Sequence, residues 1–244
     1  MSKANSISIS IQKEIQELTT YTTEIGLTVS INNQTIKQVK KSVNIPGEKT
    51  NGHQKTIDYI APSVQNEDHK IIFNDELEYK ELYKHLDEQM NYNMKLLDGA
   101  LISLVYEIQQ GRRNGILTHR LSFFPSPYLY ANEISSDDVS QEELYSDIIS
   151  KNIYPFPIRF DFDLCNRVDL VHPTSHLTLG QYKNCRIPVT SAVTPGQFIE
   201  FILRNFYYKY YDKYKDEFSR ICKMCEINES ITESEKGISH FVIK

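Results

Sequence analysis

The sequence predicts an α+β fold: an antiparallel sheet of about five strands, with N-terminal helices and a long C-terminal helix packed on it. Two observations lead to this prediction. Segments with helical spacing of apolar residues lie at both ends of the chain, and segments with strand patterns lie between them. Turns and loops, rather than helices, join most of these strands, which argues against a parallel α/β fold.

The N-terminal elements follow from apolar spacing and from residues that end helices. Ile11 and Ile15 line one face of a first helix, and Gly26 ends it. An apolar stripe from Leu82 to Met94 predicts a second helix. Between them, the polar segment 32–70 holds several turn residues and is interpreted as an extended arm or loop, or alternatively as a hairpin. The predicted elements are a helix at 8–25, a strand at 27–31 and a helix at 75–95.

The middle of the chain switches to apolar and β-branched runs that predict strands. Turn residues at 109–115 join the first two of these strands as a hairpin. A capping box from Ser140 to Glu143 predicts that a short helix begins there. The predicted elements are strands at 100–108 and 116–124, a helix at 141–150, and strands at 158–164, 176–179 and 186–189.

The C-terminal helix has the clearest start. Thr194 can cap it, Pro195 suits its first position, and Gln197 completes a capping box. The helix is predicted to continue to about residue 225, with a stripe rich in phenylalanine and tyrosine. We interpret this stripe as core or as an interface through which the chain forms a homo-oligomer, rather than as a surface that binds single strands.

Composition narrows the class of protein. The 244 residues predict a single domain over 1–244, and the net charge of −5 does not favour a general nucleic-acid coat. The basic run KQVKK at 37–41 has no aromatic residues among its lysines, so we interpret it as a solvated face. No apolar run has membrane-spanning length and the N-terminus has no signal-peptide core, so we predict a cytoplasmic protein. The four cysteines are predicted to be free thiols, with a zinc site as the weaker alternative.

The strongest candidate site lies on the strand at 158–164. Its side chains alternate, so Arg159, Asp161 and Asp163 share one face while phenylalanines occupy the other. Three charges on one face of a central strand need partners. A short connection leads to His172 and His176, and one antiparallel register places His176 beside Asp161 or Asp163.

Three roles fit these residues. The first is structural, with an Arg–Asp pair and a histidine that caps a turn. The second is general acid–base catalysis by His172 and His176, because a His–Asp hydrogen bond fixes the tautomer and raises the basicity of imidazole. The third is a site for a divalent metal ion, since two Asp and two His are reasonable ligands. Arg186, His119 and Arg120 are weaker candidates for binding a substrate phosphate.

Several motifs resemble those of an uncharacterised bacterial family. They are LLDGALISLVYE, THRLSFFPSP, PIRFDFD, VHPTSHLTLG and CRIPVTSAVTPGQFIEFILRNFY, in this order. The HPxSHLTLG…CRIPV block is the most specific. The resemblance implies a gene in an accessory region near genes for antiphage defence. A weaker resemblance to toxins of the TumE type implies a functional role for Arg159, Asp161, His172 and His176.

Two functions are therefore carried forward. The first is an effector of a defence or toxin–antitoxin system that cleaves nucleic acid, with RNA favoured, at the His/Asp site. The second is a non-enzymatic adaptor of a multi-protein defence complex, with a protein partner encoded nearby. The first is motivated by the charged face of the strand at 158–164. The second is motivated by the absence of a highly specific catalytic motif and by the tyrosine-rich helix.

Overall fold

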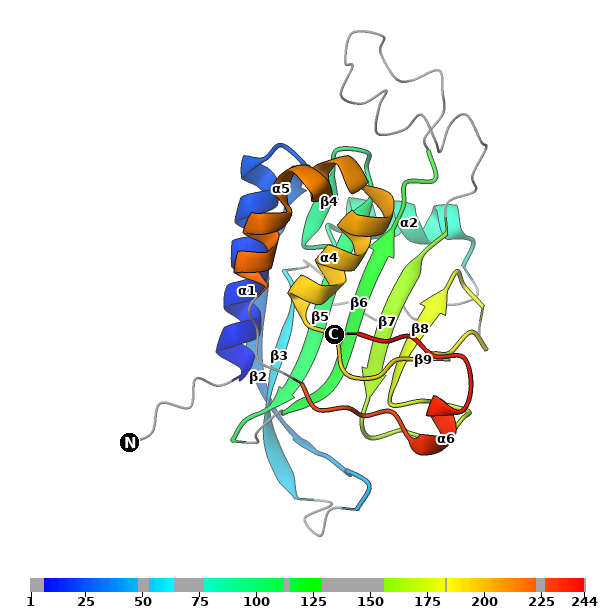
Figure 1. The fold of residues 1–244 in the computed structure, drawn as a ribbon. Helices are drawn as coiled ribbons and strands as arrows, with labels where there is room; N and C mark the ends of the chain where they lie inside the picture. The colour runs from blue at the N-terminus through cyan, green and yellow to red at the C-terminus, as the bar shows by residue number, and fades with distance from the viewer. Residues whose placement is uncertain are drawn as a thin grey trace, which may run out of the picture.

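The computed structural model describes residues 7–47, 53–63, 77–111, 115–128, 156–182, 184–222 and 227–243 (Figure 1). It has one antiparallel sheet with helices on both faces. Helices α1, α4 and α5 cover one face, and α2 packs against the other (Figure 1). The predicted α+β class is confirmed, but the sheet has nine strands, so the prediction of about five is wrong.

The strands lie in the order β1-β4-β5-β6-β7-β8-β9, with β3 beside β5 and β2 beside β3. All named pairs are antiparallel. The strands are β1 (Thr28–Ile31), β2 (Gln34–Ser42), β3 (Gln54–Pro62), β4 (Met94–Leu96), β5 (Leu101–Gln109), β6 (Ile116–Phe124), β7 (Ile158–Asp163), β8 (Ser175–Leu179) and β9 (Ile187–Pro188). The helices are α1 (Ile7–Glu24), α2 (Tyr79–Glu88), α4 (Pro195–Phe206), α5 (Tyr208–Ile221) and α6 (Glu233–Lys236).

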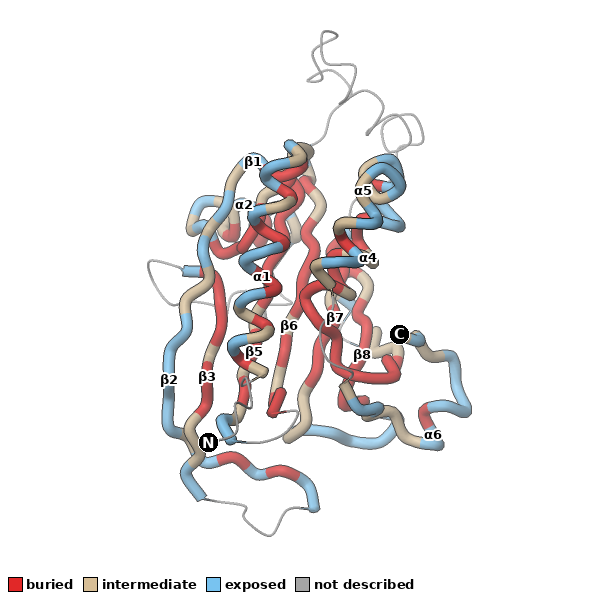
Figure 2. Tube along the Cα trace, turned by 60° about the vertical axis from the view of Figure 1, so that its left-hand side comes forward, coloured by how far each residue is buried: buried red, intermediate tan, exposed pale blue. Residues whose placement is uncertain are grey.

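Three strands lie outside the runs predicted as strands, but two of them form the hairpin that was one alternative for the segment 32–70, and that alternative is confirmed. Within the polar segment 32–70, β2 and β3 form an extended hairpin, and β3 continues the sheet beside β5. Figure 2 shows β3 mostly buried and β2 exposed along the outer side of the sheet. Because β2 is exposed on both faces, its sequence lacks the apolar alternation that predicts a strand. The third strand, β4, has only three residues.

The second predicted helix is shorter than its apolar stripe suggested. It ends at Glu88, and Met90 has a φ of 52°, in the left-handed region that a continuing helix excludes. The chain turns there, so Met94 belongs to β4 and lies in the core. The predicted first residues of this helix at 75 and 76, and the predicted helix at 141–150, lie outside the described residues.

The C-terminal helix starts as predicted but is broken in the middle. The side chain of Thr194 accepts a hydrogen bond from the Gln197 amide, and the Gln197 side chain accepts one from the Thr194 amide. Tyr207 leaves helical geometry, with φ −131° and ψ 46°, and separates α4 from α5. Its hydroxyl donates to Asp98 at 2.6 Å, so this break ties the helices to the turn between β4 and β5.

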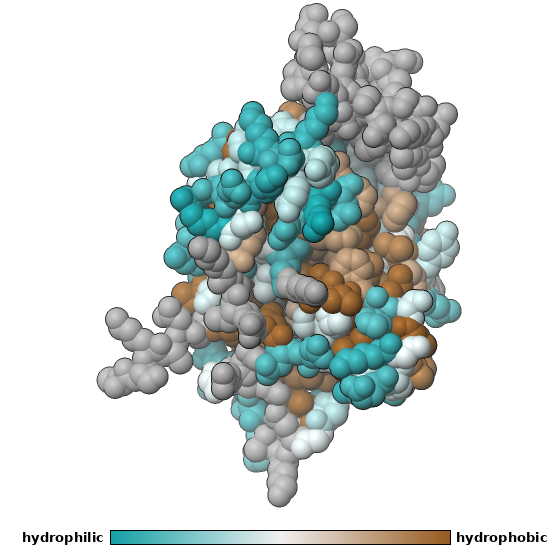
Figure 3. Space-filling view, in the orientation of Figure 1, coloured by the Kyte–Doolittle hydropathy of each residue, from teal (hydrophilic) through white to brown (hydrophobic). Residues whose placement is uncertain are grey.

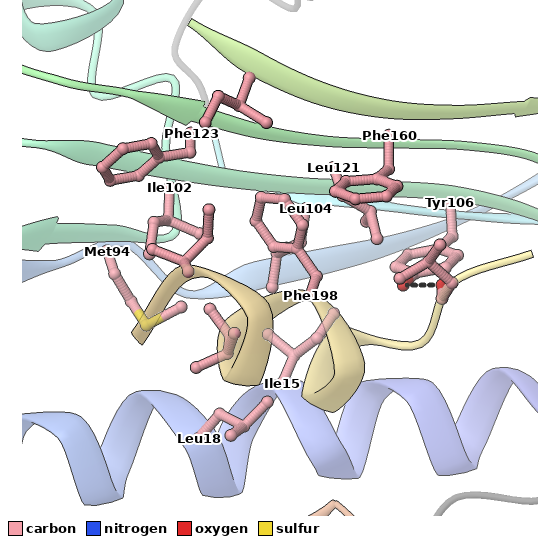
Figure 4. Packing of buried hydrophobic residues seen from close by; sticks show 14 of the residues in the cluster. Ile15, Leu18, Met94, Ile102, Leu104, Tyr106, Leu121, Phe123, Phe160 and Phe198 are labelled. Atoms are coloured by element: carbon pink, nitrogen blue, oxygen red, sulfur yellow. Dashed lines mark hydrogen bonds between the residues drawn. The ribbon is translucent and has the colours of Figure 1, made fainter. Parts of the chain in front are cut away.

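The main core lies between the sheet and the helices α1 and α4. Figure 4 shows Ile15 and Leu18 of α1 and Phe198 of α4 facing the sheet residues Leu104 and Phe160. All five are almost fully buried. A second cluster, in which α2 packs on β5 and β6, lies on the other face. None of the helices in the described part of the chain combines the length and hydrophobicity needed to cross a bilayer.

The start of α4 needs a residue without a side chain. A Cβ on Gly196 would lie 2.6 Å from both Cβ and Sγ of Cys222, and 2.7 Å from a carboxyl oxygen of Glu14. We expect Gly196→Ala to lower the free energy of unfolding by about 1–3 kcal/mol, because overpacking forces the helices apart. Urea denaturation measures this loss. Gly237→Ala is the control, because its backbone is already helical, and an equal loss in the control would contradict the packing argument.

Candidate functional site

Three neighbouring strands bring charged side chains together on the face of the sheet that α2 covers. Arg120 of β6 pairs with Asp161 of β7, and Asp161 pairs with His176 of β8. Side chains at paired positions project from the same face. This face is opposite to the one where Phe160 packs against Phe198. The prediction that His176 lies beside Asp161 or Asp163 is therefore confirmed, with Asp161 as its neighbour.

The carboxylate of Asp161 lies at the centre of these side chains. The Arg120 Nε atom donates to its Oδ1 atom at 2.6 Å. Its Oδ2 atom lies 3.7 Å from Arg159 Nε and 3.8 Å from His176 Nε2. The His172 ring meets the His176 ring edge-on, with centroids 5.1 Å apart. We call these five residues the Arg–Asp–His cluster.

Asp161 remains charged in spite of its burial. Burial opposes ionisation, but Arg120, Arg159 and His176 favour the carboxylate and together hold the pKa below its ordinary value. The Asp161 side chain is only 9% exposed. Such a buried carboxylate depends on its cationic partners.

His176 is oriented by the backbone of its own loop. Its Nδ1 atom lies 3.1 Å from the carbonyl oxygen of Pro173, which can only accept, so Nδ1 carries the proton. The Nε2 atom of the neutral ring is then an acceptor that faces Asp161. Burial lowers the pKa of His176, although Asp161 favours the protonated form. The lowered pKa keeps the ring neutral, with the unprotonated Nε2 atom facing Asp161.

Among the described residues, three arginines lie near Asp161 or His176. Arg186 lies close enough to His176 to disfavour its protonation, and its guanidinium donates to the carbonyl oxygen of Val171 at 3.4 Å. Arg120 and Arg159 thus lie beside the Asp161 carboxylate, and Arg186 lies near His176. Guanidinium groups match the geometry of phosphate oxygens.

Asp163 does not join the cluster, although it shares a face of β7 with Asp161. Its Oδ1 atom accepts hydrogen bonds from the backbone amides of Cys165 and Asn166, both at 3.0 Å. Its Oδ2 atom accepts from the Asn166 side chain at 2.8 Å. Asp163 therefore shapes the turn that follows β7.

His119 also lies away from the cluster, on the opposite face of the sheet. Adjacent residues of a strand point to opposite faces, so His119 and Arg120 cannot line one site. The Nδ1 atom of His119 donates to the carbonyl oxygen of Phe160 at 3.2 Å, and its Nε2 atom accepts from the Val193 amide at 2.9 Å. The expectation that His119 binds substrate beside Arg120 is therefore corrected. His119 joins the core to the segment before α4.

From the sequence, Arg120 was only a weaker candidate for binding a substrate phosphate. The two serines beside Arg120 were not identified. Ser122 of β6 and Ser103 of β5 pair across the strands next to Arg120, and both are almost fully buried. The alternation of side chains along β6 could have identified Ser122, because it places Arg120 and Ser122 on the same face of the sheet. As for the predicted metal alternative, no three His, Cys, Asp or Glu side chains are grouped to hold a metal ion among the described residues.

Comparisons with known proteins give a family but no relative of known function. No curated protein and no solved structure matches the chain. One family model matches residues 39–243, which include every strand from β3 to β9 and all residues of the Arg–Asp–His cluster. The predicted resemblance to an uncharacterised family is thus confirmed. The chain belongs to the family described as "Uncharacterized conserved protein (DUF2290)".

Proposed function

We propose that the chain is an effector that cleaves phosphodiester bonds in RNA at the Arg–Asp–His cluster. The observation that carries this proposal is the arrangement of His176. The Pro173 carbonyl fixes one ring nitrogen, and the other faces Asp161 across 3.8 Å. A histidine held in this way suits general base catalysis, because a neighbouring carboxylate stabilises the imidazolium that forms.

RNA carries its own nucleophile, the ribose 2′-hydroxyl. His176 Nε2 accepts the proton of this hydroxyl while the 2′-oxygen attacks phosphorus. The bond from phosphorus to the 5′-oxygen breaks, and His172 gives a proton to the leaving oxygen. The products are a 2′,3′-cyclic phosphate and a 5′-hydroxyl. The edge-on contact of the two rings supports a shared role, because it brings both histidines to one bond.

The guanidinium groups have a separate role in this mechanism. Negative charge builds up on the phosphate oxygens as the 2′-oxygen attacks, and fixed cations stabilise that charge. Arg159 and Arg186 are the candidates for this role, and Arg120 donates to Asp161 at 2.6 Å. The arginines beside Asp161 and His176 support an anionic substrate.

The test is a cleavage assay of the purified protein on total RNA, single-stranded DNA and duplex DNA, with Mg²⁺, Mn²⁺ or a chelator. We expect RNA to be cleaved to 2′,3′-cyclic phosphate ends and DNA to persist. The variant His172→Ala, His176→Ala should be slower by about a hundredfold or more. His53→Ala is the control, since His53 is exposed on the β2–β3 hairpin. Full activity in a folded double variant, or cleavage of DNA alone, contradicts the proposal.

The resemblance to families near defence genes supports a role in a defence or toxin–antitoxin system. A second candidate function, a non-enzymatic adaptor, is supported by apolar side chains on the helical face. Figure 3 shows them beside α4, and Phe206 and Tyr208 at the α4–α5 junction are 42% and 63% exposed. A stable complex with another chain in native mass spectrometry, without RNA cleavage, would favour the adaptor.

A further inference from the structure

The loop between β7 and β8, residues 164–174, carries His172 to the Arg–Asp–His cluster. Near its end the loop folds back on itself as a tight turn. The Val168 amide donates to the His172 carbonyl at 3.0 Å, and the His172 amide donates to the Val168 carbonyl at 2.7 Å. His172 therefore stands at the base of this turn, and we call residues 168–172 the His172 turn.

The His172 ring depends on this turn for its position. Among the described residues, none forms a hydrogen bond with the buried Nδ1 atom of His172, whereas the Pro173 carbonyl fixes the Nδ1 atom of His176. The His172 ring meets the His176 ring edge-on, with centroids 5.1 Å apart. The backbone of the His172 turn therefore decides where the His172 ring lies within the cluster.

The His172 turn has an unfavourable backbone conformation at its tip. Leu170 has a φ of 62°, in the left-handed region, where a residue with a side chain is strained. Its side chain is 50% exposed, so its own burial does little to offset this strain. A strained conformation persists where neighbouring contacts hold the backbone in place. On one side of Leu170, such a contact is the hydrogen bond that the Val171 carbonyl accepts from Arg186 at 3.4 Å.

On the other side of Leu170, the carboxylate of Asp169 is bound by the C-terminal segment. Its Oδ1 atom accepts a hydrogen bond from the Thr232 hydroxyl at 2.6 Å, and its Oδ2 atom accepts one from the Ser234 hydroxyl at 2.5 Å. Thr232 caps α6 and Ser234 lies in its first turn, and Figure 1 shows α6 beside this loop. The hydroxyls of Ser234 and Thr232 hold the pKa of Asp169 below its ordinary value, so the carboxylate is charged at neutral pH.

The segment that carries α6 is itself fixed to the sheet. Before α6, the Ser230 amide donates to the Thr190 carbonyl at 2.9 Å. After α6, the Phe241 amide donates to the Pro188 carbonyl at 2.7 Å, and the Thr190 amide donates to the Phe241 carbonyl at 3.0 Å. Asp169 thus joins the His172 turn to a segment that is anchored at two points beside β9.

We propose that Asp169 is a positioning residue for His172. Through its bonds with Thr232 and Ser234, it holds the turn that keeps the His172 ring against His176, where His172 can reach the leaving oxygen. Asp169 acts through His172 and takes no part in the transfer of protons. The effect on cleavage rests on the proposed function, whereas the effect on the position of the turn does not.

The first test measures RNA cleavage by variants of the full chain. We expect Asp169→Ala to lower kcat about tenfold and to leave KM within about twofold, because a displaced acid slows the reaction without weakening binding. Ser234→Ala removes one of the two bonds and leaves the Thr232 cap, so its loss should be smaller. The double variant should be no slower than Asp169→Ala, because both changes remove the same contact. Losses that multiply overturn the proposal.

The matched control is Asp212→Ala. Asp212 is also an exposed carboxylate with a hydrogen-bonded partner, Lys215 at 2.8 Å, but it lies on α5. This variant makes the same change in net charge and should keep kcat. Asp169→Asn retains an oxygen that accepts a hydrogen bond, so it should keep more of kcat than Asp169→Ala does. An equal loss in Asp212→Ala overturns the role of Asp169.

A second test does not require cleavage. The His172 amide donates to Val168 within the turn, so amide hydrogen exchange reports whether the turn is held. We expect Asp169→Ala to speed exchange of the His172 amide about tenfold and to leave the Leu104 amide, which donates to Asn93 beside the core, unchanged. Unchanged exchange at His172 overturns the proposal, and so does faster exchange at both amides, which indicates a general loss of stability.

The two tests separate this proposal from the proposed function. If the wild type does not cleave RNA, the proposed function fails and the exchange at His172 still decides whether Asp169 holds the turn. If the wild type cleaves RNA and Asp169→Ala speeds exchange without lowering kcat, the positioning role is overturned, because catalysis then does not depend on the turn.

Discussion

Asp161→Ala is expected to lower the free energy of unfolding by about 3 kcal/mol or more and to abolish RNA cleavage. The carboxylate is the anionic centre of a buried group of cations, and its Oδ1 atom accepts from Arg120 at 2.6 Å. Removing it takes away the carboxylate that these cations face in a poorly solvated place. The loss of stability and the loss of cleavage both follow from removing one side chain, so two controls are needed to separate them.

The first control is Asp163→Ala, two residues further along the same strand. Asp163 accepts hydrogen bonds within the turn after β7, so its loss should cost about 1 kcal/mol and leave cleavage unchanged. Urea denaturation and the RNA assay measure the two effects. If Asp163→Ala costs as much stability as Asp161→Ala, burial and ion pairing are not what distinguishes these carboxylates.

The second control replaces the buried ion pair by apolar side chains. The variant Arg120→Met, Asp161→Leu should recover much of the stability that Asp161→Ala loses, because well-packed apolar residues often replace a buried ion pair without loss. Cleavage should not return, since the carboxylate beside His176 is still missing. Recovered cleavage in this folded variant would show that Asp161 acts only through stability.

The fold class could be predicted from the order of patterns along the chain, but the full sheet could not. Buried strands such as β5 are rich in apolar and β-branched residues, so they can be predicted from the sequence. Strand β2 forms because its backbone pairs with that of β3. The residues of β2 are mostly exposed, so their types do not predict this pairing. Likewise, no apolar pattern reports the break at Tyr207, which follows from a tertiary hydrogen bond to Asp98.

The candidate site could be predicted in part. Alternation along β7 separated Arg159 and Asp161 from Phe160, and the short connection to β8 brought His176 beside Asp161. Arg120 was harder, because a long segment separates β6 from β7 and the sequence does not set the register between them. The alternation of residues along one strand therefore predicts which side chains a short turn brings together. It does not predict ion pairs between strands that lie far apart in the sequence.

His119 is expected to make the protein sensitive to mild acid. Burial lowers the pKa of His119 to about 3, and this outweighs the nearby Asp161 carboxylate, which favours the protonated form. In the unfolded chain the pKa is about 6.5. Below pH 6.5 the unfolded chain therefore binds a proton that the folded chain excludes, so stability falls by about 1.4 kcal/mol for each pH unit. From pH 6.5 to 5, His119 alone should remove about 2 kcal/mol.

Urea denaturation of wild type and His119→Gln between pH 7.5 and 5 tests this expectation. Glutamine does not titrate, so the stability of the variant should depend less steeply on pH. Its stability at pH 7.5 should be lower by about 1–3 kcal/mol, because either the Phe160 carbonyl or the Val193 amide loses its partner. His176, whose pKa is also lowered by burial, should account for part of the slope that persists. Asp161 contributes little in this window, because its pKa is below the ordinary value and its stabilisation is lost only at lower pH. An unchanged slope in His119→Gln would mean that His119 takes up a proton in the folded protein, which its acceptor role toward Val193 forbids.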